Sequence, residues 1–465
     1  MRNINYQIFT EDIVMRSIKT PMKAERLTTL RILYDYKTGV FRMEALKQWE
    51  PDLDFSKYNK EFYVESILTD DVKYYNTKEV EALFEKYNLA DYLEDIKNLL
   101  IEGRHFGIEA YYHEGYDILY MSNQHSRKLG INNKWHATLA GGIRRHDKNE
   151  EEIDVIIDGL NLGRGMSFKN VAGRINMGGC KQTVTMDPID LNNLQHVGFL
   201  GFCIDSCRTM TGPDMNFPTE LADAENEHFS MQYTNGPKYS VLGETGVPTA
   251  YGVYKTLKQA VNYKEGTESL AGKTATVVGL GAVGWYMAEY LLEEVDKLYI
   301  ADLNPARAEQ FKSEHEGNIA CIPLEGAYYN ECDILSPCAI GGVFSDETIP
   351  KLNCKYIWGS SNNGLKASGA EEEIRLAELL KARDIVYQVE WWHNTAGVIC
   401  GFQEYIYGKS ATQEKLYETI DSTMPKSTYM NLKQADELGI TPTENAYRLA
   451  DEIIYGDKTL EDINW

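Results

Sequence analysis

The sequence lacks the features that mark membrane-spanning, secreted and zinc-binding proteins. No stretch approaches the roughly 20 consecutive apolar residues that a membrane-spanning helix needs, and the N-terminal residues lack the apolar core of a signal peptide. The eight cysteines are scattered, and Cys203 and Cys207 have no second Cys or His pair nearby that would complete a zinc site. We therefore expect a cytoplasmic protein with buried free thiols and no bound metal.

Positive charge is also scarce. Lys and Arg number 47 against 70 Asp and Glu, which gives a formal net charge of −23. Because such a mean field repels phosphate groups, we expect neither nucleic acid nor an anionic membrane as a partner. At 465 residues, of which 43% are hydrophobic, the chain is long enough to form two or three packed domains.

One stretch has the full pattern of a dinucleotide-binding site. The β-branched run TATVV leads into Gly279, Gly281 and Gly284, a helix-like segment follows, and a second apolar strand ends at Asp302, 18 residues beyond the last glycine. The glycines permit a tight turn and the close approach of a pyrophosphate, while the Asp302 carboxylate can accept bonds from a ribose 2′-hydroxyl and repel a 2′-phosphate. The pattern favours NAD as the cofactor, although the nearby Arg307 leaves NADP as an alternative.

Beyond this motif, apolar strand-like segments continue to alternate with helical ones, which predicts a parallel sheet. Ligands bind at the carboxyl ends of the strands in such a sheet. The small and polar residues at those ends are therefore candidate site residues: Cys338, Ala339, Ser361, Asn362, Asn363 and Asn394.

Two lysines earlier in the chain form a second candidate site. Lys169 ends a run with helical apolar spacing, and Lys181, twelve positions later, follows Gly178 and Gly179 and precedes the strand-like run TVT. The bare backbone of the two glycines would let a ligand approach closely. If both ammonium groups share a pocket, burial and repulsion would lower at least one pKa toward the range of a catalytic base. For any single lysine, however, a solvated surface position is the more common outcome.

The lysine stretch, GMSFKNVAGRINMGGCK, resembles the catalytic segment of the glutamate, leucine, phenylalanine and valine dehydrogenase family. The resemblance implies that Lys169 binds the α-carboxylate of an amino acid and that Lys181 is the catalytic base. A TGxD motif, most similar to that of relatives acting on phenylalanine, implies that Asp214 lies beside Lys181. Cys180 and Arg174 depart from the family pattern, where Gly or Ala and an apolar residue are usual.

Further segments resemble the family in the same order along the chain, from about Tyr111 to Ile454. The resemblance implies that Thr249 bonds the nicotinamide amide, that Asn363 helps Lys169 to hold the substrate carboxylate, and that the other strand-end residues line the cofactor. It also assigns these residues to the substrate pocket: Gly141, Gly142, Ala140, Gly212, Val398 and Gly401.

The pocket positions carry an expectation about the substrate. Glutamate-specific relatives have a lysine at the position of Ala140, and leucine-specific relatives have larger residues at the positions of Ala140, Gly212 and Gly401. Because a buried second carboxylate would lack a partner here, we expect glutamate to be a poor substrate. The three small residues predict a roomy pocket for a bulky L-amino acid. Trp391, Trp392, His393 or the unassigned N-terminal region could instead fill that space or supply a polar partner for a basic side chain.

The fold class that we predict is α/β, with a mixed-sheet substrate and oligomerisation domain, a doubly wound Rossmann domain and the active-site cleft between them. Residues 1–103 form a helical extension unlike the family, because residues 77–101 have apolar positions at helical spacing. Residues 104–245 form the substrate domain and residues 246–400 the NAD-binding domain. Residues 401–465 are helices that return to the first domain, and relatives lead us to expect a homo-oligomer.

Together these features predict an NAD-dependent L-amino-acid dehydrogenase that catalyses reversible oxidative deamination. Two other functions stay open. A 2-oxoacid or methylene-carrier dehydrogenase would share the Rossmann domain but would not need Lys169, Lys181 and Asp214. A non-catalytic nucleotide-binding regulator would be favoured if one of these three residues were lost, and all three are present.

Overall fold

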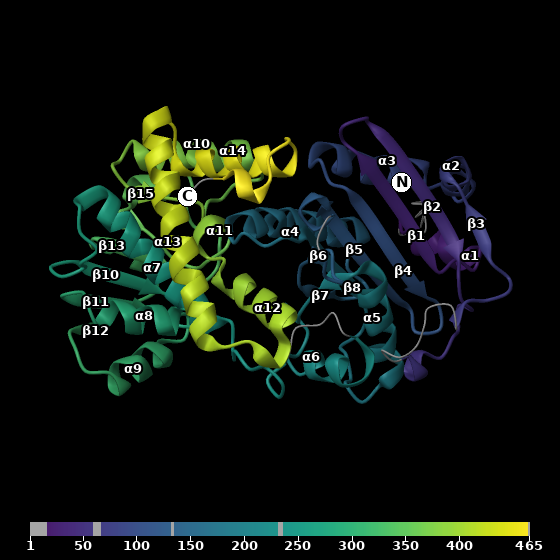
Figure 1. Cartoon of the computed structure of the whole chain (residues 1–465), viewed down its shortest axis with the longest axis horizontal. Helices are drawn as coiled ribbons and strands as arrows, with labels where there is room; N and C mark the ends of the chain where they lie inside the picture. The colour runs from purple at the N-terminus through teal and green to yellow at the C-terminus, as the bar shows by residue number, and fades with distance from the viewer. Residues whose placement is uncertain (1–15, 59–66, 132–133, 231–235, 464–465) are drawn as a thin grey trace, which may run out of the picture.

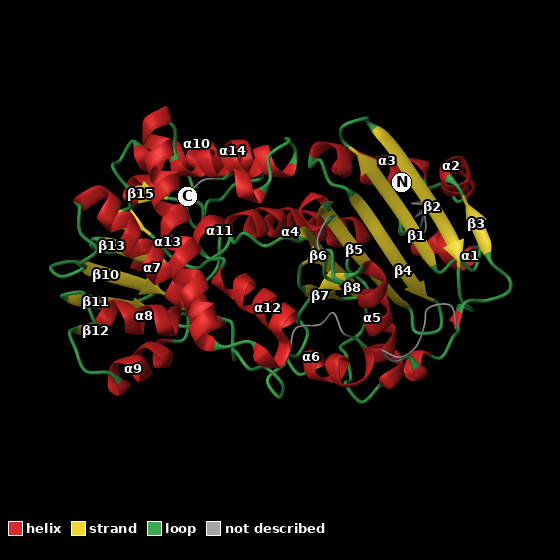
Figure 2. Ribbon diagram, viewed as in Figure 1, coloured by secondary structure: helices red, strands yellow, loops and turns green. Residues whose placement is uncertain are grey.

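Two β-sheets divide the protein into two halves. The computed structural model describes residues 16–58, 67–131, 134–230 and 236–463, and every structural statement below concerns these ranges. The first sheet lies on the right of Figure 1 and the second on the left, with helices packed around both (Figure 2). Among the described residues, no helix is long and apolar enough to cross a membrane.

The first sheet is mixed. Within the described ranges it has nine strands in the order β3-β2-β1-β4-β5-β8-β6-β9, with β7 paired to β8. The pairings from β3 through β5 to β8 are antiparallel, and those of β6 and β7 with β8 are parallel. The strands are β1 (Thr29–Asp35), β2 (Val40–Lys47), β3 (Lys73–Tyr75), β4 (Gly107–His113), β5 (Ile118–Ser126), β6 (Leu139–Ala140), β7 (Ile143–His146), β8 (Gly178–Thr185) and β9 (Thr209–Met210).

Helices cover the two faces of this sheet unequally. One face packs against α2 (Thr77–Lys86), α3 (Ala90–Glu102) and α4 (Glu152–Ala172), and the other against α5 (Leu194–Cys207). The shorter helices of this half are α1 (Lys19–Ala24), α6 (Leu221–Ala224), a π-helix at Glu225–Phe229, and 3-10 turns at Phe55–Lys57 and Lys128–Gly130.

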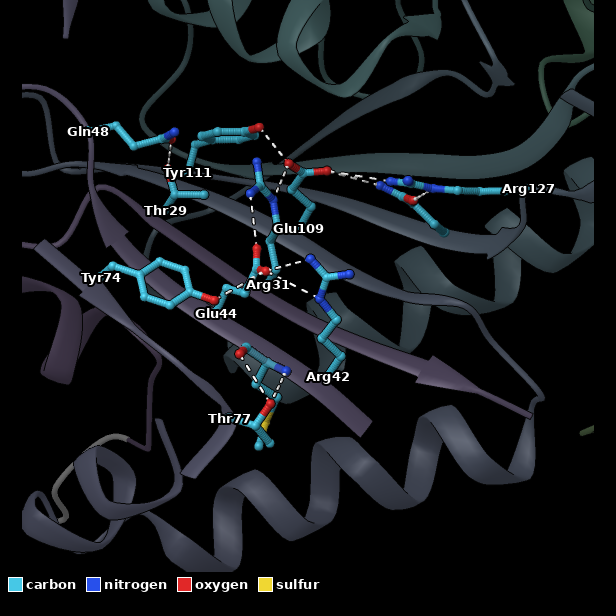
Figure 3. A network of polar contacts seen from close by, with 12 residues as sticks. Thr29, Arg31, Arg42, Glu44, Gln48, Tyr74, Thr77, Glu109, Tyr111 and Arg127 are labelled. Carbon is cyan, nitrogen blue, oxygen red and sulfur yellow. Dashed lines mark hydrogen bonds and ion pairs between the residues drawn. The ribbon is translucent and has the colours of Figure 1, made fainter. Parts of the chain in front are cut away.

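Period-two patterning explains how the N-terminal strands join the sheet. In β1, Leu30 and Ile32 are buried in the core beneath α2 and α3, whereas Arg31 faces the opposite side. There, charged side chains link neighbouring strands (Figure 3). Arg31 Nε donates to Glu109 Oε1 at 2.8 Å, and Arg31 Nη1 lies 3.3 Å from Glu44 Oε2. The carboxylates are buried, and the ion pairs satisfy them across three strands.

The helical extension expected over residues 1–103 is therefore only partly correct. Helices α2 and α3 form as the apolar spacing predicts, but β1, β2 and β3 extend the first sheet beyond β4. Residues 1–15 and 59–66 of this segment lie outside the described residues. Local apolar spacing does not predict that these strands join the sheet, because the pairing of β1 with β4 joins residues 78 positions apart, such as Arg31 and Glu109.

The second sheet is parallel throughout, in the order β12-β11-β10-β13-β14-β15. Its strands are β10 (Thr274–Val278), β11 (Lys297–Ala301), β12 (Ile319–Cys321), β13 (Ile334–Pro337), β14 (Tyr356–Ile357) and β15 (Val386–Tyr387). Apolar clusters cover both faces, which is why these strands are continuous apolar runs. The flanking helices are α7 (Gly246–Glu265), α8 (Gly284–Leu292), α9 (Pro305–Glu314) and α10 (Ala370–Lys381), with 3-10 turns at Ala327–Tyr329 and Ile349–Lys351.

The C-terminal helices connect the two halves. Tyr447, Ala450 and Ile453 of α14 pack with Phe168 and Val171 of α4 in one apolar cluster, so the end of the chain returns to the first sheet. The helices are α11 (Glu390–His393), α12 (Ala396–Tyr407), α13 (Gln413–Leu438) and α14 (Pro442–Ile454), with 3-10 turns at Gly408–Ser410 and Leu460–Asp462.

Candidate active site

Close packing of α4 on β8 brings the two lysines into one region. A Cβ on Gly179 would lie 2.1 Å from the backbone nitrogen of Ser167, and a Cβ on Gly178 would lie 2.2 Å from Ser126 O. The bare backbone at these glycines is therefore occupied by α4 and β5. This corrects the expectation that a ligand approaches there: the glycines let the helix sit directly on the strand.

Lys181 and Asp214 form the central ion pair of the site. Lys181 projects from β8 with only 7% of its surface exposed, and its Nζ donates to Asp214 Oδ2. Burial lowers the pKa of Lys181 although the neighbouring carboxylate acts to raise it. For Asp214, burial acts to raise the pKa, but the charge and hydrogen bond of Lys181, together with the charge of Arg144, lower it overall. A neutral amine beside a carboxylate can accept and pass on protons.

The Gly-Gly pair that follows β6 leaves room for the lysine. A Cβ on Gly142 would lie 3.1 Å from Lys181 Nζ and 3.3 Å from Gly212 O, and a Cβ on Gly141 would lie 1.8 Å from Cys180 O. Asp214 is held on the same side, because its backbone N donates to Ile143 O at 2.9 Å. Gly142 therefore lies beside Lys181 and Asp214, and Gly141 lies against Cys180.

Lys169 contacts the second half of the protein. Its Nζ donates to Asn362 Oδ1 at 2.8 Å, and Asn394 Nδ2 donates to the same oxygen at 2.9 Å. Burial and then the charge of Lys181 lower the pKa of Lys169 to about 8. Asn363, the expected partner for the substrate carboxylate, is exposed and has a left-handed φ of 53°. Of the two asparagines, it is Asn362 that the structure brings to Lys169.

The glycine motif forms a tight loop between β10 and α8. Gly279 has a φ of +94°, and a Cβ on Gly284 would lie 1.8 Å from Gly279 O, so neither position accepts a larger residue without strain. Asp302 follows β11 and its Oδ2 accepts from Leu280 N at 2.7 Å. Arg307 Nε donates to Leu280 O at 3.1 Å, so the arginine lies against the same loop.

The remaining candidate cofactor residues gather around the ends of the strands. Ala339 packs on Gly279, and Cys338 N donates to Val278 O at 2.8 Å. Thr249 lies on α7 beside Gly397, with its hydroxyl donating to Thr245 O at 2.7 Å. Buried Ser361 Oγ and Asn394 Oδ1 have no hydrogen-bond partner among the described residues. These orphaned polar atoms, together with the open space at Gly281, fit a polar cofactor along this edge.

The substrate-pocket residues meet an apolar cluster between the halves. Ala140 is fully buried there with Met177, Ile399 and other apolar residues, and Val398 packs against it. Gly401 is buried on α12, and Gly212 adjoins Gly142. The aromatic residues that could have filled this space are engaged elsewhere: Trp391 stacks on Phe168, Trp392 contacts Ser427, and His393 stacks on Trp358.

Two charged residues near the lysines were missed as site residues. Arg144 Nη2 lies 3.4 Å from Asp214 Oδ2, and Arg144 Nη1 donates to both oxygens of Asp158 at 3.0 Å. Arg144 closely follows Gly141 and Gly142, in the run GGIR, but the sequence alone gives it no role. Nothing in the sequence singles out Asp158, which lies in the middle of α4 among apolar residues.

Comparisons with known proteins agree with this arrangement. The model of the Glu/Leu/Phe/Val dehydrogenase dimerisation domain matches residues 129–236. Leucine dehydrogenase of Thermoactinomyces intermedius is 34% identical over 289 residues, which cover 61% of this chain and 76% of that protein. Phenylalanine dehydrogenase of Lysinibacillus sphaericus is 32% identical over 331 residues, which cover 69% of this chain and 82% of that protein.

Solved structures share the two-part fold. The L-tryptophan dehydrogenase from Nostoc punctiforme superposes with a TM-score of 0.64 at 24% identity, covering 77% of this chain and 98% of that one. The hetero-hexameric glutamate dehydrogenase from Thermus thermophilus superposes with a TM-score of 0.58 at 16% identity, covering 75% and 86%. The predicted fold class, a mixed-sheet part joined to a Rossmann part, is confirmed. The chain belongs to the glutamate, leucine, phenylalanine and valine dehydrogenase family of amino-acid dehydrogenases.

Proposed function

We propose that the protein is an NAD-dependent L-amino-acid dehydrogenase that converts a bulky amino acid to the 2-oxo acid and ammonia, reversibly. The observation that carries the proposal is the ion pair between buried Lys181 and partly exposed Asp214, with Lys169 beside it, facing the half that holds the glycine loop. A 2-oxoacid dehydrogenase needs no such set, because it neither forms nor hydrolyses an imine.

Each residue of the set has a defined task in deamination. Lys169, still charged below a pKa of about 8, binds the substrate α-carboxylate near the asparagine pair at Asn362 and Asn363. When bound, NAD would supply the acceptor for the hydride that leaves the substrate Cα. Lys181, with its pKa lowered by burial, takes a proton from the water that attacks the resulting iminium carbon. Asp214, in contact with Lys181, relays protons to the departing ammonia.

The cofactor would be held by the second half of the protein. Gly279, Gly281 and Gly284 give the pyrophosphate access to the N-terminus of α8, whose free N–H groups favour an anion. Asp302 lies where a ribose 2′-hydroxyl would be recognised, which supports NAD over NADP. The unpartnered Ser361 Oγ and Asn394 Oδ1 are suited to hydrogen-bond the cofactor.

The substrate is inferred from the pocket around Ala140. Ala140 and its neighbours in this cluster are apolar, so a second substrate carboxylate would lose its hydration there without gaining a cation. Glutamate should therefore be a poor substrate. The small residues Ala140, Gly212 and Gly401 leave room that a bulky side chain fills by packing contacts, and Trp391, Trp392 and His393 are committed to other contacts.

The domain division and the assembly belong to the same proposal. Helix α7 begins at Gly246, between the last strand of the first sheet and the first strand of the second, and this supports a boundary near residue 245. We expect a homo-oligomer, since closed symmetric assemblies are the commonest form of soluble enzymes. A monomer mass by light scattering at micromolar concentration would contradict this.

One experiment tests the activity and the substrate together. NADH formation is followed by absorbance at alkaline pH with a panel of L-amino acids, including glutamate, alanine, leucine, phenylalanine and tryptophan. The expected order of kcat/KM places large apolar side chains first. A preference for glutamate, or for alanine over every large side chain, would contradict the proposal that the pocket fits a bulky apolar side chain. Absence of NADH formation with every amino acid would contradict the proposed dehydrogenase activity.

A further inference from the structure

Behind the Lys181–Asp214 pair, a second layer of charges connects β7 with α4. Arg144 of β7 donates through Nη1 to both oxygens of Asp158 at 3.0 Å, and its Nη2 lies 3.4 Å from Asp214 Oδ2. Lys181 Nζ contacts that same Asp214 oxygen. One carboxylate oxygen therefore faces two cations, and the guanidinium spans two carboxylates.

The supporting layer is itself held in place. His146, also on β7, has Nε2 3.3 Å from Asp158 Oδ2 and Nδ1 3.0 Å from Glu150 Oε1. Burial acts to lower the pKa of His146, but Asp158 and Glu150 outweigh it and raise the pKa. His146 and Arg144 share Asp158, which keeps the guanidinium fork aimed at Asp214.

The charge of Arg144 bears directly on the lysine. A carboxylate in contact with an ammonium favours the protonated lysine, which is inactive as a base. Besides burial, Arg144 lowers the pKa of Lys181, whereas Asp214 and the more distant Asp158 raise it. Two further charged groups lie near the site: Lys169 of α4, whose own pKa is lowered by burial and by Lys181, and Glu390 of α11, whose charge acts to raise the pKa of Lys169.

We propose that Arg144 is a positioning residue that, held by Asp158, shares the charge of Asp214 and so allows Lys181 to release its proton. The inference rests on the proposed function for its catalytic consequence, but the ionisation of Lys181 is measurable without turnover. Removing the guanidinium leaves Asp214 paired with Lys181 alone. The lysine then holds its proton to higher pH, by roughly one pH unit for a charge at this distance.

The test is an NMR titration of protein labelled with 13C at the lysine ε-carbon, in which the Lys181 signal is assigned by its absence in Lys181→Ala. Arg144→Gln should raise the Lys181 titration midpoint by about one pH unit. Arg144→Lys, which keeps a cation near Asp214, should bring the midpoint back most of the way to the wild-type value. The matched control is Arg145→Gln, which removes the same charge from the next residue. Arg145 contacts Met186 O and Asn216 O rather than Asp214, so the midpoint should not move.

A double variant tests the proposal in case Arg144→Gln alone fails to fold. Arg144→Gln leaves Asp158 half-paired, whereas Arg144→Gln with Asp158→Asn leaves no uncompensated carboxylate there. The double variant should still raise the Lys181 midpoint above wild type, because of the two replaced residues only Arg144 touches Asp214. The rise should be smaller than in Arg144→Gln, since the lost Asp158 charge acts to raise the Lys181 pKa. An unchanged midpoint in both variants, or an equal rise in Arg145→Gln, would overturn the proposal.

Activity gives the independent readout. The pH at which kcat for deamination reaches half its maximum should move upward with the NMR midpoint in Arg144→Gln. A lower kcat with an unmoved pH profile would mean a merely structural role. If no amino acid is oxidised by the wild type, the proposed function fails, and the NMR midpoints still decide the role of Arg144.

Discussion

Lys169 Nζ donates a 2.8 Å hydrogen bond to Asn362 Oδ1, 193 residues further along the chain. The bond joins the end of α4 to a loop of the parallel sheet, so the residue proposed to hold the substrate carboxylate is positioned by both halves of the protein. A substrate carboxylate would take over a contact that Asn362 makes here. We therefore expect substrate binding to be coupled to the contact between the two halves of the protein.

Replacing Lys169 should act mainly on substrate binding. Lys169→Ala removes a charge-assisted hydrogen bond, worth roughly 1.5 to 3 kcal/mol, that exists in both ground and transition states. KM for the amino acid should rise about tenfold to a hundredfold with a smaller change in kcat. In the wild type, KM should also rise as the pH passes the Lys169 pKa of about 8, because the lysine loses its charge. Steady-state kinetics across pH check this, and the variant should lack that rise.

Replacing Lys181 should abolish turnover without loosening the cofactor. Lys181→Ala removes the base, which typically contributes a factor of roughly 100 to 10,000 in rate. NAD affinity, measured by quenching of protein fluorescence, should stay near wild type because the glycine loop is in the other half. A kcat within about tenfold of wild type would rule out the assigned role.

Enlarging Gly142 should displace the Lys181 amine. In Gly142→Ala, the new Cβ would lie 3.1 Å from Lys181 Nζ and 3.3 Å from Gly212 O, so the lysine must shift. We expect kcat to fall by about tenfold or more, since small displacements of a catalytic group are costly. The control is Gly165→Ala on α4, where an added Cβ meets nothing within 4 Å. Full activity in Gly142→Ala would show that the amine needs no such space.

Changing Asp302 should relax the choice between the two dinucleotides. Asp302→Asn keeps the shape that accepts from Leu280 N but removes the charge that repels a 2′-phosphate. The ratio of kcat/KM for NADP to that for NAD should rise. Arg307→Gln, on α9 and in contact with the glycine loop, should move the ratio the other way. A wild type that already prefers NADP would mean that Arg307 outweighs Asp302.

The N-terminal strands should be integral to stability. Ile32 on β1 is 2% exposed, and Ile32→Ala should lower the free energy of unfolding by about 2 to 5 kcal/mol. Val40→Ala at the start of β2, where the side chain is 59% exposed, should change it by less than about 0.5 kcal/mol. Urea denaturation measures both. Similar small effects would mean that β1 and β2 are a detachable addition to the sheet.

The sequence by itself determined the features that depend on neighbouring residues. The turn at Gly279 and the helix after it need only neighbouring residues, so strand, glycine loop and acid could be read in order. The spacing of Lys169 and Lys181 likewise reflects one helix followed by one strand. The fold class followed from the order of the elements and was confirmed. The roles of Lys169 and Lys181 came from the resemblance to the family and stay predictions.

Only the tertiary structure decided which distant groups meet. It brought Asp158 to Arg144, placed Asn362 rather than Asn363 on Lys169, filled the space beside Gly178 and Gly179 with α4 and β5, and paired β1 with β4. Local sequence patterns report periodicity and turn geometry within a few residues. Charge pairs and strand pairs between remote segments depend on which surfaces are buried together, and that is set by the packing of the whole chain.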